Sequence, residues 1–166
     1  MNEFSSVSDV IQGGPLGRPR SSSGRAFASA PLTNVTVTAT LAQTASSSLT
    51  VMSFSGVDPS GTNGSGAIGA MKSASASTGA PTATVTTTRD GSWVIGVGND
   101  WSTATPRTLG SNQSMVHQYL APVGDTFWVQ RTSSSIAASG TTVTINDTSP
   151  TGDRYNLTVC EILPRP

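Results

Sequence analysis

Hydrophobic and polar residues alternate with a period of two in short runs along most of the chain. The clearest runs are 93–97, 115–120 and 127–131, in which β-branched and aromatic residues alternate with small or polar ones. Such alternation is typical of half-buried β-strands. Runs of the same kind occur at 34–41, 49–54, 82–88, 141–147 and 154–163, separated by residues that favour turns. A weaker run at 67–77 predicts an edge strand or an extended crossover.

This pattern of short strands, with no helical stretch of useful length, predicts an all-β fold: an antiparallel β-sandwich, with a jelly roll as the favoured variant. Trp93 and Trp128 fall on strands among apolar neighbours and are expected in the core, whereas Trp101 falls on a long polar connection. Cys160 is the only cysteine and lies in the last alternating run. We expect it to be a small buried hydrophobe rather than a reactive thiol.

Residues 1–30 have a different composition, with little periodic apolar pattern and much Ser, Gly, Pro and Arg. A segment of this kind buries too little apolar surface to offset its ordering entropy. We therefore expect a flexible arm at 1–30, followed by a single β-sandwich domain at 31–166. Three arginines in the arm could bind an acidic partner, although a solvated tail is the simpler interpretation.

Composition bears on location and partners. Charged residues make up only 11% of the chain, the net charge is zero, and Ser and Thr supply nearly a third of all positions. This balance resembles that of secreted bacterial β-proteins, and the absence of a basic face argues against a nucleic-acid partner. No window is apolar enough for a membrane span, and the first residues lack the features of a signal peptide. We expect an extracellular location, with the chain as part of a longer protein.

The first functional hypothesis is a non-catalytic binding or structural module, with polysaccharide as a candidate ligand. Exposed aromatic rings can stack on the apolar faces of sugars, and amide groups nearby can bond their hydroxyls. The candidate ligand-binding residues are Trp101, Tyr119, Asn99 and Gln118.

The second hypothesis is a small hydrolase of esters or lactones, which needs a nucleophile, a base and an orienting acid. His117 is the only histidine and therefore the only imidazole base, and Asp125 or Asp100 could orient it. Nothing selects among the serines Ser92, Ser102 and Ser114 as nucleophile. A glycosidase pair is a third possibility, drawn from Asp100, Asp125, Asp147, Asp153 and Glu161, whose spacing is not distinctive.

Asn and Asp residues recur at strand ends, where they favour turns. The same oxygens could bind a hard cation such as calcium, which would also permit a calcium-dependent hydrolase. The candidate metal ligands are Asp58, Asn63, Asp147 and Asp153. No other cofactor is expected, because one His and one Cys cannot complete a zinc site.

Several segments, among them SWVIGVGNDW, VHQYLAPVGDTFWVQR and DRYNLTVCEILP, resemble a β-sandwich module of unassigned role that recurs in large secreted proteins of soil bacteria. The resemblance covers roughly residues 31–164. It implies an extracellular β-sandwich, and it also implies further strands before the LTNVTVT segment that residues 1–30 do not match. A sandwich without those strands would expose sheet edges, so we expect a homo-oligomer.

Overall fold

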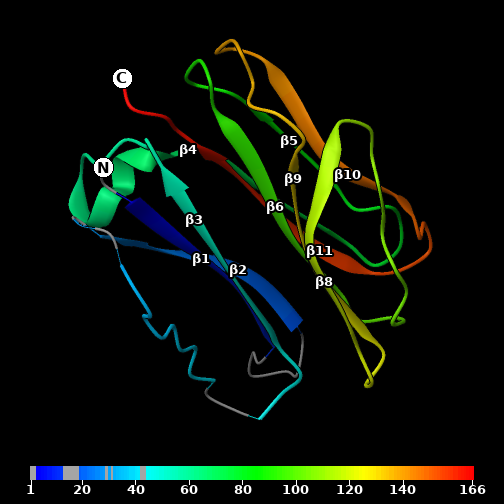
Figure 1. Ribbon diagram of the computed structural model, residues 1–166. Coiled ribbons are helices and arrows are strands. Elements are labelled where there is room, and N and C mark those ends of the chain that lie inside the picture. The colour runs from blue at the N-terminus through cyan, green and yellow to red at the C-terminus, as the bar shows by residue number, and fades with distance from the viewer. Residues whose placement is uncertain (1–2, 13–18, 29, 31, 42–43) are drawn as a thin grey trace.

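The chain is built from antiparallel sheets with almost no helix (Figure 1). The computed structural model describes residues 3–12, 19–28, 30, 32–41 and 44–166. Its largest sheet has five strands in the order β4-β11-β6-β9-β8. These strands are β4 (Ile68–Ala76), β6 (Trp93–Asp100), β8 (Gln113–Ala121), β9 (Asp125–Thr132) and β11 (Tyr155–Ile162).

A three-stranded sheet packs on one face of this central sheet and completes the sandwich. Its strands are β5 (Thr82–Thr86), β10 (Thr142–Ser149) and the short β7 (Thr108–Leu109), in the order β5-β10-β7. Val85 and Ile145 of this sheet meet Trp128 and Leu157 of the central sheet in the main hydrophobic cluster. The predicted all-β antiparallel sandwich is therefore confirmed.

A second three-stranded sheet, in the order β2-β1-β3, lies against the opposite face of the central sheet. It consists of β1 (Glu3–Gln12), β2 (Pro19–Phe27) and β3 (Ser48–Ser55), and the short 3-10 helix η1 (Thr62–Ala67) follows it. Met52 and Phe54 of β3 pack against a cluster that includes Ile95, Cys160 and Ile162. Cys160 is buried, as predicted.

Strand alternation sends neighbouring residues of the central sheet to opposite layers. Trp128 belongs to the cluster shared with β5 and β10, whereas Phe127 and Val129 belong to a cluster that Met52 of β3 contacts. Gly98 makes room for the indole ring, because a Cβ added there would lie 2.1 Å from Cζ2 of Trp128. This glycine allows the largest side chain of the core to lie flat across β6.

The N-terminal part differs from the pattern expected from sequence. β1 and β2 lie within residues 1–30, for which we expected a flexible arm, and the flexibility of that segment stays a prediction. Conversely, the strand expected at 34–41 is not formed, because residues 32–41 lie outside the sheets. The weak run at 67–77 does form an edge strand, β4.

Candidate functional site

A fully buried ion pair closes one end of the sandwich. Asp100 is the last residue of β6, and Arg107 lies in the connection that leads to β7. The Arg107 guanidinium donates to the Asp100 carboxylate, and both side chains have no exposed surface. The guanidinium also lies over the Trp128 ring, 4.5 Å from its centroid, in a cation–π contact. The cation is thus held between a carboxylate and an aromatic ring.

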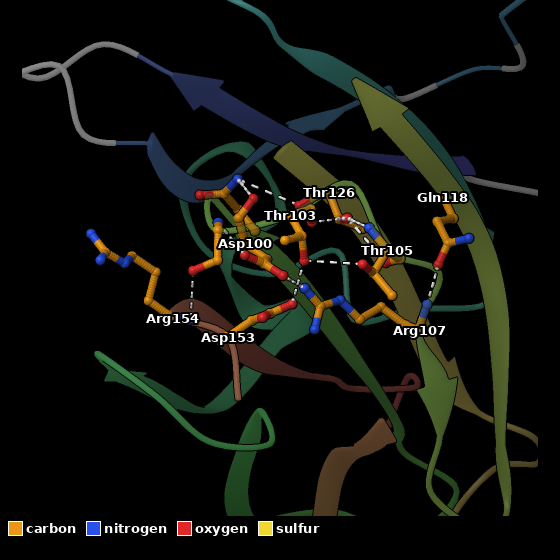
Figure 2. A network of polar contacts seen from close by, with 10 residues as sticks. Asp100, Thr103, Thr105, Arg107, Gln118, Thr126, Asp153 and Arg154 are labelled. Atoms are coloured by element: carbon orange, nitrogen blue, oxygen red, sulfur yellow. Dashed lines mark hydrogen bonds and ion pairs between the residues drawn. The ribbon is translucent and has the colours of Figure 1, made fainter. Parts of the chain in front are cut away.

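Threonine side chains fasten the connection that carries Arg107 (Figure 2). The Thr105 N–H donates to Oγ1 of Thr126 on β9 at 3.0 Å, and the Arg107 N–H donates to Oε1 of Gln118 on β8 at 2.7 Å. The Thr103 hydroxyl donates to Asp153 at 2.8 Å. These bonds tie the connection to two strands of the central sheet and to the β10–β11 turn. They hold the ion pair in place, and both of its side chains are fully buried.

A second buried carboxyl lies near the same arginine. Asp147 of β10 is 2% exposed, and among the described residues neither of its carboxylate oxygens has a hydrogen-bond partner. Burial raises the pKa of Asp147 to about 7, although the Arg107 charge and the Gln130 amide act in the opposite direction. Burial also raises the pKa of Asp100 to about 6, against the Ser102 N–H and Arg107. Both carboxyls are therefore costly to keep ionised at neutral pH.

The Glu161 carboxyl is also fully buried. It accepts hydrogen bonds from the N–H groups of Ala70 and Thr88, each at 2.8 Å, and from the Thr88 hydroxyl at 2.9 Å. Burial acts to raise the pKa of Glu161, but these bonds lower it below its ordinary value. Glu161 therefore joins β4 to the segment after β5, a structural role that satisfies both of its oxygens.

The structure does not assemble the predicted hydrolase residues. His117 is exposed on β8 and pairs with Val129, so the two side chains share one face of the central sheet. Asp100 lies on the other face, in its ion pair with Arg107. Asp125 is four positions from Val129 along β9, which corresponds to about 13 Å of strand.

The three candidate nucleophilic serines form hydrogen bonds with groups other than His117. Ser92 is buried and donates to the Arg89 carbonyl at 2.7 Å, and Ser114 bonds the Ser133 hydroxyl at 2.9 Å. Ser102 accepts from the Arg154 N–H at 3.1 Å. Within the part of the chain that the structure describes, His117 has no hydrogen bond to any serine or carboxylate.

The predicted ligand-binding residues differ in exposure: Tyr119 is exposed, Trp101 and Gln118 are half-buried, and Asn99 is buried. Tyr119 is 39% exposed, and its ring stacks on the buried Phe127 with centroids 6.2 Å apart. Trp101 is half-buried and follows β6 directly, in the predicted connection. Asn99 is fully buried and donates to the Asp100 and Thr126 carbonyls, and Gln118 accepts from the Arg107 N–H.

The predicted calcium ligands do not form one cluster. Asp58 accepts from the Arg89 guanidinium at 2.8 Å and from the Ser60 N–H at 2.9 Å, and hydrogen bonds from these two residues lower the pKa of Asp58 to about 2. Asn63 lies in η1 with a left-handed φ of 50°. Asp147 is inside the sandwich, and Asp153 accepts from Thr103. Among the described residues, no three His, Cys, Asp or Glu side chains are placed to hold a metal ion.

Sequence reasoning missed Arg107 and Gln130. In the sequence Arg107 is one charged residue in a polar connection. Its guanidinium lies over the Trp128 ring only because of the way the chain folds. Gln130 occupies a polar position in a strand, yet it is fully buried and donates to Oε1 of Gln113 at 3.1 Å. One usable signal was the alternation itself, which places Gln130 on the same face as Trp128.

Comparisons with protein-family models, with curated proteins and with solved structures found no match for this chain. Among the described residues, no helix has the length and apolar character needed to span a membrane.

Proposed function

We propose that this chain is a non-catalytic extracellular binding module that binds polysaccharide at the end of the central sheet where Tyr119 and Trp101 lie. The observation that carries the proposal is the Tyr119 ring, which is 39% exposed and rests on the buried Phe127 ring. A ring held in this way is already oriented, so the Tyr119 side chain loses little conformational entropy when a sugar stacks on it.

Strand register supports a site that includes both aromatic residues. Tyr119 lies level with Asn99 across β9, and Trp101 is two residues beyond Asn99. Two strand spacings and two residues of rise separate the two backbone positions by about 12 Å, a distance that a short oligosaccharide spans. His117 is exposed and shares its side of β8 with Tyr119, so its imidazole can bond sugar hydroxyls.

The hydrolase alternative has less support. Its only base, His117, has no carboxylate or serine partner among the described residues. Asp100, one of the two candidate orienting acids, forms an ion pair with Arg107 instead. A hydrolase of this type would also need a cleft that brings a carbonyl to the base.

Extracellular location rests on the composition and on the resemblance to secreted bacterial modules. Calcium binding and assembly into a homo-oligomer stay predictions of the same proposal. The edge strands of the central sheet, β4 and β8, are candidates for such assembly.

Retention of the purified chain on insoluble cellulose, chitin and starch tests the proposal. We expect retention on at least one of them, and a loss of about tenfold or more with Tyr119→Ala or Trp101→Ala, since each removes a ring from the site. Val123→Ala is the matched control, because Val123 is apolar and 66% exposed in the nearby turn. Equal retention of all variants, or turnover of an ester substrate that His117→Ala abolishes, would overturn the proposal.

A further inference from the structure

We propose that a pocket between β2 and the central sheet binds a short-chain aliphatic carboxylate, whose charged group pairs with Arg25. The pocket has a volume of about 80 Å³ and is lined by Ser23, Gly24, Arg25, Ile68, Met71, Ile95 and Cys160. The inference does not depend on the polysaccharide site, which involves β8 and the connection after β6.

The floor of the pocket is an apolar row across three strands. Cys160 of β11 pairs directly with Met71 of β4 and with Ile95 of β6, so the three side chains share one face of the central sheet. Ile95 and Cys160 are buried, and the neighbouring Ile68 is half-buried. This row offers an uncharged surface to an aliphatic chain.

β2 contacts both β6 and β11 and supplies the polar wall of the pocket. Burial raises the pKa of the Cys160 thiol to about 11, with a further contribution from Glu161, whereas the Arg25 charge acts in the opposite direction. The Arg25 guanidinium is therefore close enough to act on the thiol. The thiol is neutral at pH 7, so it does not neutralise the guanidinium.

The Arg25 guanidinium has no anionic partner in the part of the chain that the structure describes. The ion pairs found there join Arg89 to Asp58 and Arg107 to Asp100. A guanidinium binds a carboxylate through two parallel hydrogen bonds, which fix its orientation. A ligand carboxylate would therefore complement the charge at this pocket.

The volume of the pocket limits the length of the ligand. Its 80 Å³ is roughly half of the ~150 Å³ of an apolar protein cavity that holds benzene. An aliphatic chain of about three carbons fits this space, with the carboxylate at Arg25. Met71 is 65% exposed, so one wall of the pocket is a flexible side chain that can adjust to the chain.

A nuclear magnetic resonance titration of the isotopically labelled full-length chain with sodium butyrate tests the proposal. We expect saturable shift changes at the amides of Gly24, Met71 and Cys160. Butyramide, the neutral amide of the same chain length, should bind at least about tenfold more weakly, because the charge-assisted hydrogen bonds are lost. No saturable change with butyrate, or equal affinity for the two compounds, would overturn the proposal.

Variants of the exposed Arg25 test the role of its charge. Arg25→Gln should weaken butyrate binding about tenfold or more, whereas Arg25→Lys should retain part of the affinity. Lys72→Gln is the matched control. It removes the same charge beside Met71, but strand alternation places Lys72 on the opposite face of β4, so butyrate should bind as to the parent. Undiminished binding by Arg25→Gln, or an equal loss with Lys72→Gln, would overturn the proposal.

Alkylation of Cys160, the only thiol of the chain, gives an independent readout. Iodoacetamide forms a bond between the Cys160 Sγ and its own methylene carbon, with release of iodide and of the thiol proton. Saturating butyrate should slow this reaction at least about tenfold, because a bound ligand covers Sγ and stabilises the folded chain. An alkylation rate that butyrate leaves unchanged would overturn the proposal.

Discussion

The Asp147 carboxyl provides a quantitative test of the buried network through Asp147→Asn. Its ordinary pKa of 3.8 is raised to about 7 in the folded chain. A folded-state pKa above the unfolded value means that the folded chain binds more protons between about pH 4 and 7. Stability contributed by the protonated form is therefore present below about pH 4 and is lost as pH rises through about 7.

The difference between the two pKa values corresponds to roughly 4 kcal/mol at pH 8. Asparagine cannot ionise, so Asp147→Asn should be about as stable as the parent at pH 4 and more stable by up to that amount at pH 8. Urea unfolding followed by tryptophan fluorescence at both pH values measures the two free energies, because Trp128 is fully buried in the folded chain. Some loss of stability with pH should remain in the variant, since burial also raises the pKa of Asp100.

Asp90→Asn is the matched control, because Asp90 is exposed and its pKa is lowered by hydrogen bonds from Ser139. It should gain no stability at pH 8. The reasoning is refuted if Asp147→Asn is less stable than the parent at pH 8, since the charged carboxylate would then be stabilised by Arg107 rather than penalised by burial.

Two further substitutions test the packing around the Trp128 ring. Gly98→Ala should lower the free energy of unfolding by roughly 1–3 kcal/mol, because the new methyl group overlaps that ring, whereas Gly152→Ala, with open space around it, should change little. Arg107→Met should cost roughly 3–5 kcal/mol, because it leaves the buried Asp100 without its partner; a change below 1 kcal/mol in urea unfolding would contradict a tightly buried pair.

The period-two alternation was sufficient to predict the central sandwich. Trp93 and Trp128 lie on strands and Trp101 on a connection, as the polar and apolar spacing indicated. The prediction succeeded because each strand buries one face against a neighbouring layer. Apolar residues therefore occupy every second position of the strand, and this spacing is visible in the sequence.

The N-terminal part could not be predicted in the same way. β1 and β2 are rich in Ser and carry little apolar periodicity, yet they pair through backbone hydrogen bonds that any sequence can make. The alternating segment 32–41 lies outside the sheets, because local pattern does not decide which strand occupies an edge.

The candidate site was predicted in part. Sequence proposed Tyr119 and Trp101 as aromatic ligand-binding residues, and neither is fully buried. It also grouped them with Asn99, which is buried, and Gln118, which accepts from the Arg107 N–H. The partnership of Asp100 with Arg107 depends on how the connection between β6 and β7 folds back. Sequence spacing carries no information on that path.

The central claim is a polysaccharide site at Tyr119 and Trp101, and a nuclear magnetic resonance titration tests it most directly. The isotopically labelled chain is titrated with soluble oligosaccharides prepared from whichever polysaccharide retains it. The proposal predicts saturable shift changes at the amides of Tyr119, Trp101 and His117, with the sugar recovered unchanged. Saturable changes confined to other parts of the fold, or cleavage of the sugar during the titration, would contradict it.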